Sequence, residues 1–386
     1  MAERRPLQPW QVLAGGVCGL VLTIGLARFA YTPLLPLMQS QTGLTDAGAG
    51  ALAAANYAGY MTGAVWFAWV DDVKWRHRLY GLGLWLALLM TAAMAVSASP
   101  VWWALCRFLA GWCGATGMLL GSGLVLGWLM RQGQAPQLGP FFMGIGLSIM
   151  VTALGAWMGN AMWPEWSSQW LAFAGMGLLF AAPAWRWRPP VPPVVITNAA
   201  ANASRMSRRW LMTLLLSYFA AGWGFVISAT FTVAIVEREP ALIGQGPWAW
   251  ALVGLAAMPA VFVWDRVARL WGDKWALLMA FGLQTLAIIL PALSGSLWAA
   301  LVGALGYGAT FIGIVSMTLA WVGRRSPQNP GKAMARLTLS YGAAQIVAPV
   351  VVGAMAQATG SFHAGLWLTA GVMALGMLLL ATLPED

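Results

Sequence analysis

Charged residues are scarce in this chain, and their scarcity excludes several classes of protein. Of the 386 residues only 8% are Asp, Glu, Lys or Arg, while 60% are hydrophobic. A soluble domain carries about 25% charged residues, and no packed core could absorb this much apolar surface. We therefore exclude a water-soluble enzyme, a nucleic-acid-binding protein and a disordered regulator. The 45 Gly and 25 Trp are typical of a polytopic membrane protein, in which Gly lets helices approach closely and Trp lies at the interfaces.

Residues that carry catalysis or bind metals are also few. The two histidines, His77 and His363, lie at the ends of predicted loops, and Cys18, Cys106 and Cys113 lie within apolar runs. This distribution indicates neither a metal site, nor a buried proton relay, nor a disulfide framework. Because we find no nucleophile constellation and no phosphate-binding loop, we expect no enzymatic activity and no cofactor.

Long apolar runs are abundant instead. About 20 helical residues, rising 1.5 Å each, cross a bilayer core of about 30 Å. Twelve such runs occur, near 12–38, 47–69, 79–98, 101–130, 139–162, 168–185, 210–236, 246–264, 275–293, 297–322, 333–357 and 364–383. The first is too long for a signal peptide and lacks a cleavage site. Since alternating strands of a membrane β-barrel are missing, the sequence predicts an all-α integral membrane protein with twelve transmembrane helices.

Basic residues predict the orientation of these helices. Of the 21 Lys and Arg, only Arg238 falls in an outer segment when the N-terminus is placed inside. Arg28 and Arg107 lie within spans, which leaves 18 in inner segments. The positive-inside rule then places both termini in the cytoplasm. We expect a monomer in the lipid bilayer whose partner is a small-molecule substrate, with no binding of nucleic acid.

The twelve runs divide into two similar halves. A polar linker, 186–209, contains two Pro-Pro pairs and five arginines, and it separates an N-terminal six-helix bundle (1–185) from a C-terminal one (210–386). Asp71 and Asp265 follow corresponding spans, and Gly-Ala-Thr at Gly114 recurs at Gly308; both pairs are 194 residues apart. Such a duplicated six-helix unit is the architecture of the major facilitator superfamily.

Arg28 is the most informative single residue. It is the seventeenth residue of the first run, and all eleven acidic residues fall in loops or at span ends. An ionisable group inside a membrane marks a candidate functional site. In a water-filled cavity its guanidinium would bind an anion, ideally a bidentate carboxylate or phosphate. Alternatively, backbone carbonyls at the Pro33 and Pro36 breaks and tyrosine rings satisfy it. For Arg107, snorkelling and a cavity role are equally open, and Arg336 is expected to be an interfacial anchor.

Aromatic and amide residues gather on the spans that line the cavity in this fold. We predict a substrate-binding site formed by Arg28 together with Tyr31, Asn56, Tyr60, Tyr218, Trp223, Tyr307, Tyr341 and Gln345. Tyr57, Phe225 and Phe311 belong to the same group of residues. A wall of tyrosines with a few amides suits a small amphipathic or aromatic ligand, although each residue taken alone is better explained by ordinary helix packing.

The loop after the second run resembles a signature of the superfamily. The segment from Ala68 to Arg78 is similar to Gly-x-x-x-Asp-(Arg)-x-Gly-Arg-(Arg), with Asp72 at the acidic and Arg76 at the first basic position, while Ala68 and Trp75 replace both glycines. The resemblance implies that Asp72 and Arg76 belong to a conformational latch that forms when the inner side closes. The alternative is a solvated acid among ordinary positive-inside charges.

Several motifs together resemble one branch of the superfamily, the YbfB/YjiJ-type bacterial transporters. They are Gly25-Leu-Ala-Arg28-Phe-Ala-Tyr31-Thr-Pro33-Leu-Leu-Pro36, Asn56-Tyr-Ala-Gly-Tyr60, Arg107-Phe-Leu-Ala-Gly111, Gly222-Trp-Gly-Phe225 through Phe231, Tyr307-Gly-Ala-Thr-Phe311 and Tyr341-Gly-Ala-Ala-Gln345 through Pro349. The resemblance implies a secondary transporter of the bacterial inner membrane and no particular substrate.

Three functions follow from these observations. We favour secondary active transport of a small organic anion, or of an amphipathic compound bearing one, by alternating access. The alternative is proton-coupled export of neutral or cationic hydrophobic compounds. It is weakened because no carboxylate lies within a span and because Gly144-Ile-Gly146 stands where antiporters have Gly-x-x-x-Gly-Pro. A sensor or membrane scaffold is the third class, and it lacks a soluble domain in this sequence to signal through.

Overall fold

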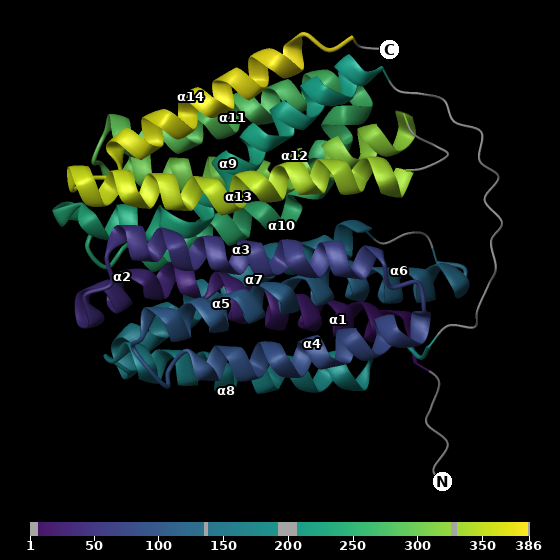
Figure 1. Ribbon diagram of the computed structural model, residues 1–386, viewed down its shortest axis with the longest axis horizontal. Helices are drawn as coiled ribbons and strands as arrows, with labels where there is room; N and C mark the ends of the chain where they lie inside the picture. The colour runs from purple at the N-terminus through teal and green to yellow at the C-terminus, as the bar shows by residue number, and fades with distance from the viewer. Residues whose placement is uncertain (1–6, 135–137, 192–206, 326–329, 385–386) are drawn as a thin grey trace.

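The protein is a bundle of twelve helical spans lying roughly side by side (Figure 1). The computed structural model describes residues 7–134, 138–191, 207–325 and 330–384, and no strand occurs among them. The first span consists of α1 (Pro9–Leu20), the π-helix η1 (Val21–Phe29) and α2 (Tyr31–Thr42), and the fourth of α5 (Pro100–Ala115), the π-helix η2 (Thr116–Gly121) and α6 (Ser122–Arg131). The others are α3 (Asp46–Ala68), α4 (Val73–Ala93), α7 (Leu138–Met162), α8 (Trp166–Arg186), α9 (Arg208–Arg238), α10 (Gly246–Trp271), α11 (Asp273–Leu293), α12 (Leu297–Arg325), α13 (Pro330–Thr359) and α14 (His363–Ala381), with a short 3₁₀ turn, η3 (Pro240–Leu242).

The predicted all-α fold with twelve spans is confirmed. Within the described residues, nine of the spans are long and apolar enough by composition alone to cross a membrane. The other three, α3, α4 and α8, lie among these nine in the bundle. In α3 the span is rich in Gly and Ala and carries Asn56, Tyr57 and Tyr60, which is the composition of a helix that packs closely against its neighbours.

The third span begins and ends about five residues earlier than predicted. We expected 79–98, but α4 covers Val73–Ala93 because Asp72 is its N-cap: the Asp72 carboxylate accepts a hydrogen bond from the Lys74 amide at 2.8 Å. Such a cap satisfies an N–H group that the first helical turn leaves free. At the other end, the indole of Trp102 donates to the carbonyl of Ala93 at 2.7 Å. The eighth span is also longer than predicted, since α10 continues past 264 to Trp271.

The two halves of the chain repeat the same packing. In the first half the second and fourth spans, α3 and α5, make the most extensive contact, and in the second half the eighth and tenth spans, α10 and α12, do so. Between the halves, α3 packs on α13 and α7 packs on α10. These four helices are spans two, eleven, five and eight. Spans two and eight are equivalent in the two halves, and so are spans five and eleven, so the two contacts between the halves are equivalent, as a duplicated unit requires. Residues 192–206 of the predicted linker lie outside the described part of the chain.

The described chain begins and ends on one side of the bundle, which we call the terminal side, and the loops after α2 and α9 lie on the opposite, far side (Figure 1). On the far side the halves are joined by several bonds. Thr32 donates to the carbonyl of Ala229, Asp46 pairs with Arg238, and the Ala47 amide donates to the Gln357 side chain at 3.2 Å.

The first span contacts the other half through its central and far parts. Its far part, α2, packs on α9 of the other half, whereas its terminal part, α1, packs on α6, α7 and α8 of its own half. The structure is therefore closed on the far side.

Candidate substrate-binding site

Arg28 lies near the middle of the bundle, at the boundary between the halves. It belongs to the π-helix η1 and is 7% exposed. Its guanidinium carbon lies 4.2 Å from the ring centre of Tyr57 and 5.2 Å from that of Tyr60, both on α3, and 6.0 Å from that of Phe225 on α9. Rings from both halves therefore surround the guanidinium, and their negative faces favour a cation.

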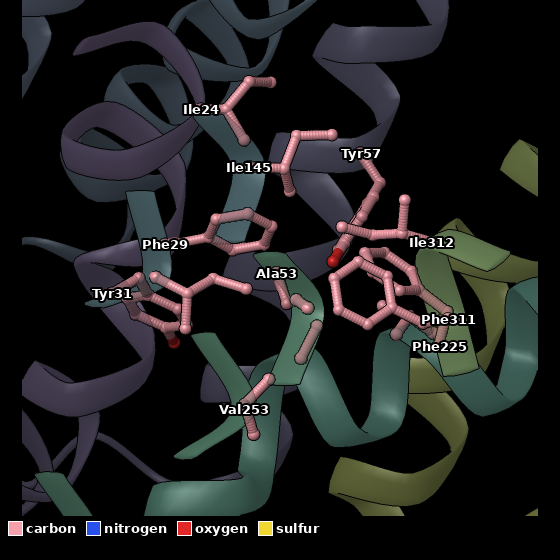
Figure 2. Close-up of a cluster of buried hydrophobic side chains, with 14 of the residues drawn as sticks. Ile24, Phe29, Tyr31, Ala53, Tyr57, Ile145, Phe225, Val253, Phe311 and Ile312 are labelled. Atoms are coloured by element: carbon pink, nitrogen blue, oxygen red, sulfur yellow. The ribbon is translucent and has the colours of Figure 1, made fainter. Parts of the chain in front are cut away.

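Phe225 is the centre of the aromatic cluster that the second half presents to Arg28. Its ring lies 5.4 Å from Phe311, 5.8 Å from Tyr341 and 6.4 Å from Tyr307, and it meets Tyr57 edge-on at 6.3 Å. Figure 2 shows Phe225 and Phe311 facing Tyr57 across the boundary between the halves. Tyr218 extends the cluster by packing against Tyr341 at 4.6 Å. Arg28, Tyr57, Tyr60 and this cluster, from here on the central site, combine one cation with a large apolar and aromatic surface.

Within the described residues, Arg28 forms no ion pair. Ion pairs there join Arg238 to Asp46, Arg269 to Asp265 and Arg324 to Asp273, and none of them includes Arg28. The Arg28 Nε atom is buried without a hydrogen-bond partner. In the same part of the chain, the hydroxyl groups of Tyr57, Tyr60, Tyr218 and Tyr341 have no hydrogen-bond partner either, whereas Tyr307 donates to the Phe225 carbonyl at 3.1 Å. The central site thus offers a guanidinium and four hydroxyl groups to a ligand.

Tyr31 and Asn56, both predicted to bind substrate, belong to a second buried layer in the first half. The Tyr31 hydroxyl donates to the carbonyl of Ala49 at 3.0 Å, and the Asn56 amide donates to the carbonyl of Arg107 at 2.8 Å. The Arg107 guanidinium lies 4.5 Å above the Tyr31 ring. These side chains hold α3, α5 and the first span together, although the Asn56 Oδ1 atom remains without a partner.

Trp223 lies apart from the other predicted site residues. Its indole donates to the Thr369 hydroxyl on α14 at 3.3 Å, inside the second half. The reason is helical geometry: Trp223 and Phe225 are two residues apart, and side chains at that spacing point to different faces of a helix. Gln345 is buried one turn from Tyr341 on α13, on the helix that packs against α3.

The side chains of Asp72 and Arg76 do not pair with each other in this conformation, although the Arg76 amide donates to the Asp72 carbonyl at 3.0 Å inside the first turn of α4. Asp72 caps α4, while the Arg76 Nε atom donates to the carbonyl of Val70 at 2.6 Å. The two residues therefore shape the turn between α3 and α4 on the terminal side. The same side holds Arg336, which is exposed on α13 as an interfacial anchor would be.

A hollow of about 510 Å³ lies on the far side, at the level of the Asp46–Arg238 ion pair. It is lined by Pro36, Gln39, Ser40, Leu44, Thr45, Asp46, Ala234, Glu237, Arg238, Ala356, Gln357 and Gly360. None of the residues of the central site belongs to this lining. Between the hollow and Arg28, α2 packs on α9, and the Thr32 hydroxyl donates to the carbonyl of Ala229.

The prediction of the site missed the role of Arg107. Arg107 is 3% exposed and does not snorkel: its Nη1 atom donates to the carbonyls of Arg28 at 3.0 Å and Ala27 at 3.2 Å. Arg107 therefore binds two backbone carbonyls near the Pro33 break, where we had considered such carbonyls as partners of Arg28. The signal in the sequence was Pro33, since a proline deprives preceding carbonyls of a hydrogen-bond donor.

A twelve-helix fold with two similar halves and a buried, charged site between them defines a transporter of the major facilitator superfamily. The comparison of sequences supports this assignment and narrows it. Residues 20–381 match the family described as "Uncharacterised MFS-type transporter YbfB", and the chain belongs to that family. No sequence among the curated proteins matches it.

Solved transporters share the fold at low sequence identity. The nucleoside transporter NupG superposes with a TM-score of 0.75 at 12% identity over 97% of this chain and 100% of that one. A bacterial homologue of the human lysosomal transporter Spinster superposes with a TM-score of 0.70 at 15% sequence identity, over 98% of this chain and 97% of that one. The human organic anion transporter MFSD10 superposes with a TM-score of 0.64 at 19% sequence identity, over 97% of this chain and 100% of that one. At these identities the likeness establishes the fold alone.

Proposed function

We propose that the protein is a secondary active transporter of a small organic anion, or of an amphipathic compound that bears one, working by alternating access across a bacterial inner membrane. Arg28 binds the anionic group in this proposal. Tyr60, Tyr218, Tyr307 and Tyr341, with Tyr57, Phe225 and Phe311, contact the apolar part of the substrate, and Gln345 borders the site. Trp223 is left out because it points into its own half.

The observation that carries the proposal is a buried guanidinium without a carboxylate partner. A charged group in the centre of a membrane costs at least about 2.5 kcal/mol and is retained where it serves a function. Ring faces recover part of this cost, about 0.5–2 kcal/mol for each cation–π contact. A substrate anion would recover more, because a planar guanidinium binds a carboxylate through two parallel hydrogen bonds.

The location of Arg28 supports alternating access. The central site lies at the boundary of the two halves, and the far side is closed by bonds that join them. Access from the terminal side, which we propose to be cytoplasmic, would be followed by opening of the far side. In that second conformation we expect Asp72 and Arg76 to form the latch that they do not form here.

Export of neutral or cationic hydrophobic compounds is the second candidate, favoured by one observation. Arg28 already has ring faces as partners, at 4.2 Å for Tyr57, so its charge could be structural. The aromatic cluster would then bind apolar compounds directly. A proton would have to be carried elsewhere, and Asp46, 8% exposed at the boundary of the halves, is the acid placed to do so.

The test compares matched ligands by thermal shift on the purified full chain. Benzoate and hexanoate are paired with the neutral amides benzamide and hexanamide, on the wild type and on Arg28→Gln. The proposal predicts that the carboxylates stabilise the wild type more than the amides do, and that the substitution removes this difference. Equal stabilisation by acid and amide in both proteins would favour the second candidate. If Arg28→Gln does not fold, Arg28→Lys is used, which keeps the charge and loses the planar fork.

A further inference from the structure

The first span has too few hydrogen-bond donors at the point where its π-helix ends. In η1 the Ala30 amide donates to the carbonyl of Gly25, five residues back, whereas in α2 the Leu34 amide donates to that of Ala30, four residues back. Between these two bonds lie four carbonyls, those of residues 26–29, and three backbone nitrogens, those of residues 31–33. Since Pro33 has no N–H, two donors remain for four acceptors. Two carbonyls therefore have no partner within the helix.

Arg107 fills this deficit. Its Nη1 atom, which carries two hydrogens, donates to two of these four carbonyls, those of Ala27 and Arg28, at 3.2 and 3.0 Å. The helix lacks two N–H donors for its four carbonyls, and the Arg107 side chain supplies two N–H donors. Because unsatisfied backbone groups inside a membrane are costly, the match indicates that Arg107 and Pro33 are functionally linked.

Arg107 is itself held in place. Its guanidinium lies over the Tyr31 ring, and its own carbonyl accepts a hydrogen bond from the Asn56 side chain. A snorkelling arginine would instead reach the membrane surface. The side chain is directed inward by partners on two other spans, as expected of a structural support for the π-helix.

We propose that Arg107 is a positioning residue for Arg28. Its side chain supplies the hydrogen-bond donors that the backbone lacks between the π-helix and Pro33, and so fixes the backbone from which the Arg28 side chain extends. π-Helical segments occur frequently at functional sites, and here one places a charged residue in the central site. The consequence for substrate binding rests on the proposed function. The hydrogen bonding of the first span does not, so the two can fail separately.

The experiment is a rescue. Pro33→Ala returns one N–H to the segment, so it should reduce the effect of losing Arg107. Pro36→Ala, three residues along the same helix, makes the same chemical change where Arg107 has no contact, and serves as the matched control. Amide hydrogen exchange of residues 24–36 is measured by mass spectrometry on the full chain without ligand, for Arg107→Gln, Arg107→Gln/Pro33→Ala and Arg107→Gln/Pro36→Ala.

We expect Arg107→Gln to speed exchange in this segment about tenfold or more, because hydrogen bonds to a charged group are lost. Pro33→Ala should reverse much of that increase, and Pro36→Ala should not. If Arg107→Gln does not fold, the same comparison is made with Arg107→Lys, which keeps donors but loses the fork. Unchanged exchange, an increase spread evenly over the protein, or equal effects of the two proline substitutions would overturn the proposal.

Benzoate affinity provides the second readout. Arg107→Gln should weaken it, and Pro33→Ala should restore part of the loss in the double variant. If benzoate does not bind the wild type while the exchange pattern appears as expected, the proposed substrate class is wrong and the role of Arg107 in the first span stands. If benzoate binds but the rescue is absent from both readouts, Arg107 does not position Arg28.

Discussion

The two buried arginines differ in what their guanidinium groups contact. Arg107 donates through Nη1 to backbone carbonyls of the first span, whereas Arg28 is surrounded by aromatic rings and donates to no group in the described part of the chain. Among the same residues, the Nε atom is without a partner in both. The guanidinium of Arg107 therefore uses part of its hydrogen-bonding capacity within the protein. A guanidinium that meets only ring faces retains hydrogen-bonding capacity for a ligand. This difference is why we assign the anion to Arg28.

The ring of Tyr57, and not its hydroxyl, should stabilise Arg28 in the absence of ligand. Tyr57→Phe keeps the ring face 4.2 Å from the guanidinium, so its melting temperature should stay close to that of the wild type. Tyr57→Leu removes a cation–π contact worth about 0.5–2 kcal/mol and should melt earlier. If both variants lose the same stability, the hydroxyl rather than the ring supports Arg28.

The importance of Arg28 could be predicted from the sequence, and its neighbours only in part. A single charge in an apolar run is conspicuous, but which ring faces it depends on the rotation of each helix about its axis. Sequence spacing therefore identified the aromatic residues as a group, including Tyr60 and Tyr341. It did not distinguish Tyr57, which contacts Arg28, from Trp223, which points toward α14.

At the level of elements, the closest helix contacts depend on glycine. A Cβ atom at Gly111 of α5 would lie 1.8 Å from the carbonyl oxygen of Asn56 on α3. The same addition at Gly175 of α8 would meet nothing within 4 Å. Gly111 therefore allows α3 and α5 to approach, while Gly175 has no such role.

These two glycines give a matched pair of variants. Gly111→Ala forces backbone apart and should cost about 1–3 kcal/mol or more, as overpacking does. Gly175→Ala should be neutral or stabilising by about 0.5–1 kcal/mol, since alanine favours a helix. Thermal unfolding in detergent measures both. A similar melting temperature for the two variants would show that the α3–α5 contact adjusts freely.

Helix number was predictable, and helix geometry was less so. Apolar length defines a span regardless of its neighbours, which is why twelve spans were found. The π-helices η1 and η2 left no pattern in composition. They lie against each other in the first and fourth spans, where Thr23 and Gly117 are side by side. The early start of α4 could have been anticipated from Asp72, a favoured N-cap residue before the run.

At the scale of the whole molecule, the far-side closure should depend on the Asp46–Arg238 ion pair. Asp46 also accepts a hydrogen bond from Gln39 at 2.7 Å, and it lies in the first half while Arg238 lies in the second. Asp46→Asn keeps the shape and removes the charge. We expect it to populate a conformation in which the far side opens.

Distances between spin labels can report this opening. Labels at Ala98→Cys and Ile243→Cys, on exposed far-side loops of the two halves, in a chain whose native cysteines are replaced, should show longer and broader separations with Asp46→Asn. Glu165→Gln is the control, because Glu165 is an exposed far-side acid that belongs to none of the ion pairs named above. An unchanged distribution, or equal broadening in the control, would show that this ion pair does not hold the halves together.

The central claim is that Arg28 binds the charge of the substrate, and an affinity measurement tests it most directly. The tightest carboxylate from the thermal-shift panel is titrated by calorimetry into the wild type, Arg28→Lys, Arg28→Gln and the exposed control Arg336→Gln. A hydrogen bond to a charged group is worth about 1.5–3 kcal/mol. We therefore predict that Arg28→Gln weakens binding about 10- to 150-fold, that Arg28→Lys falls between it and the wild type, and that Arg336→Gln changes nothing. A folded Arg28→Gln protein that binds the carboxylate as tightly as the wild type would contradict the account.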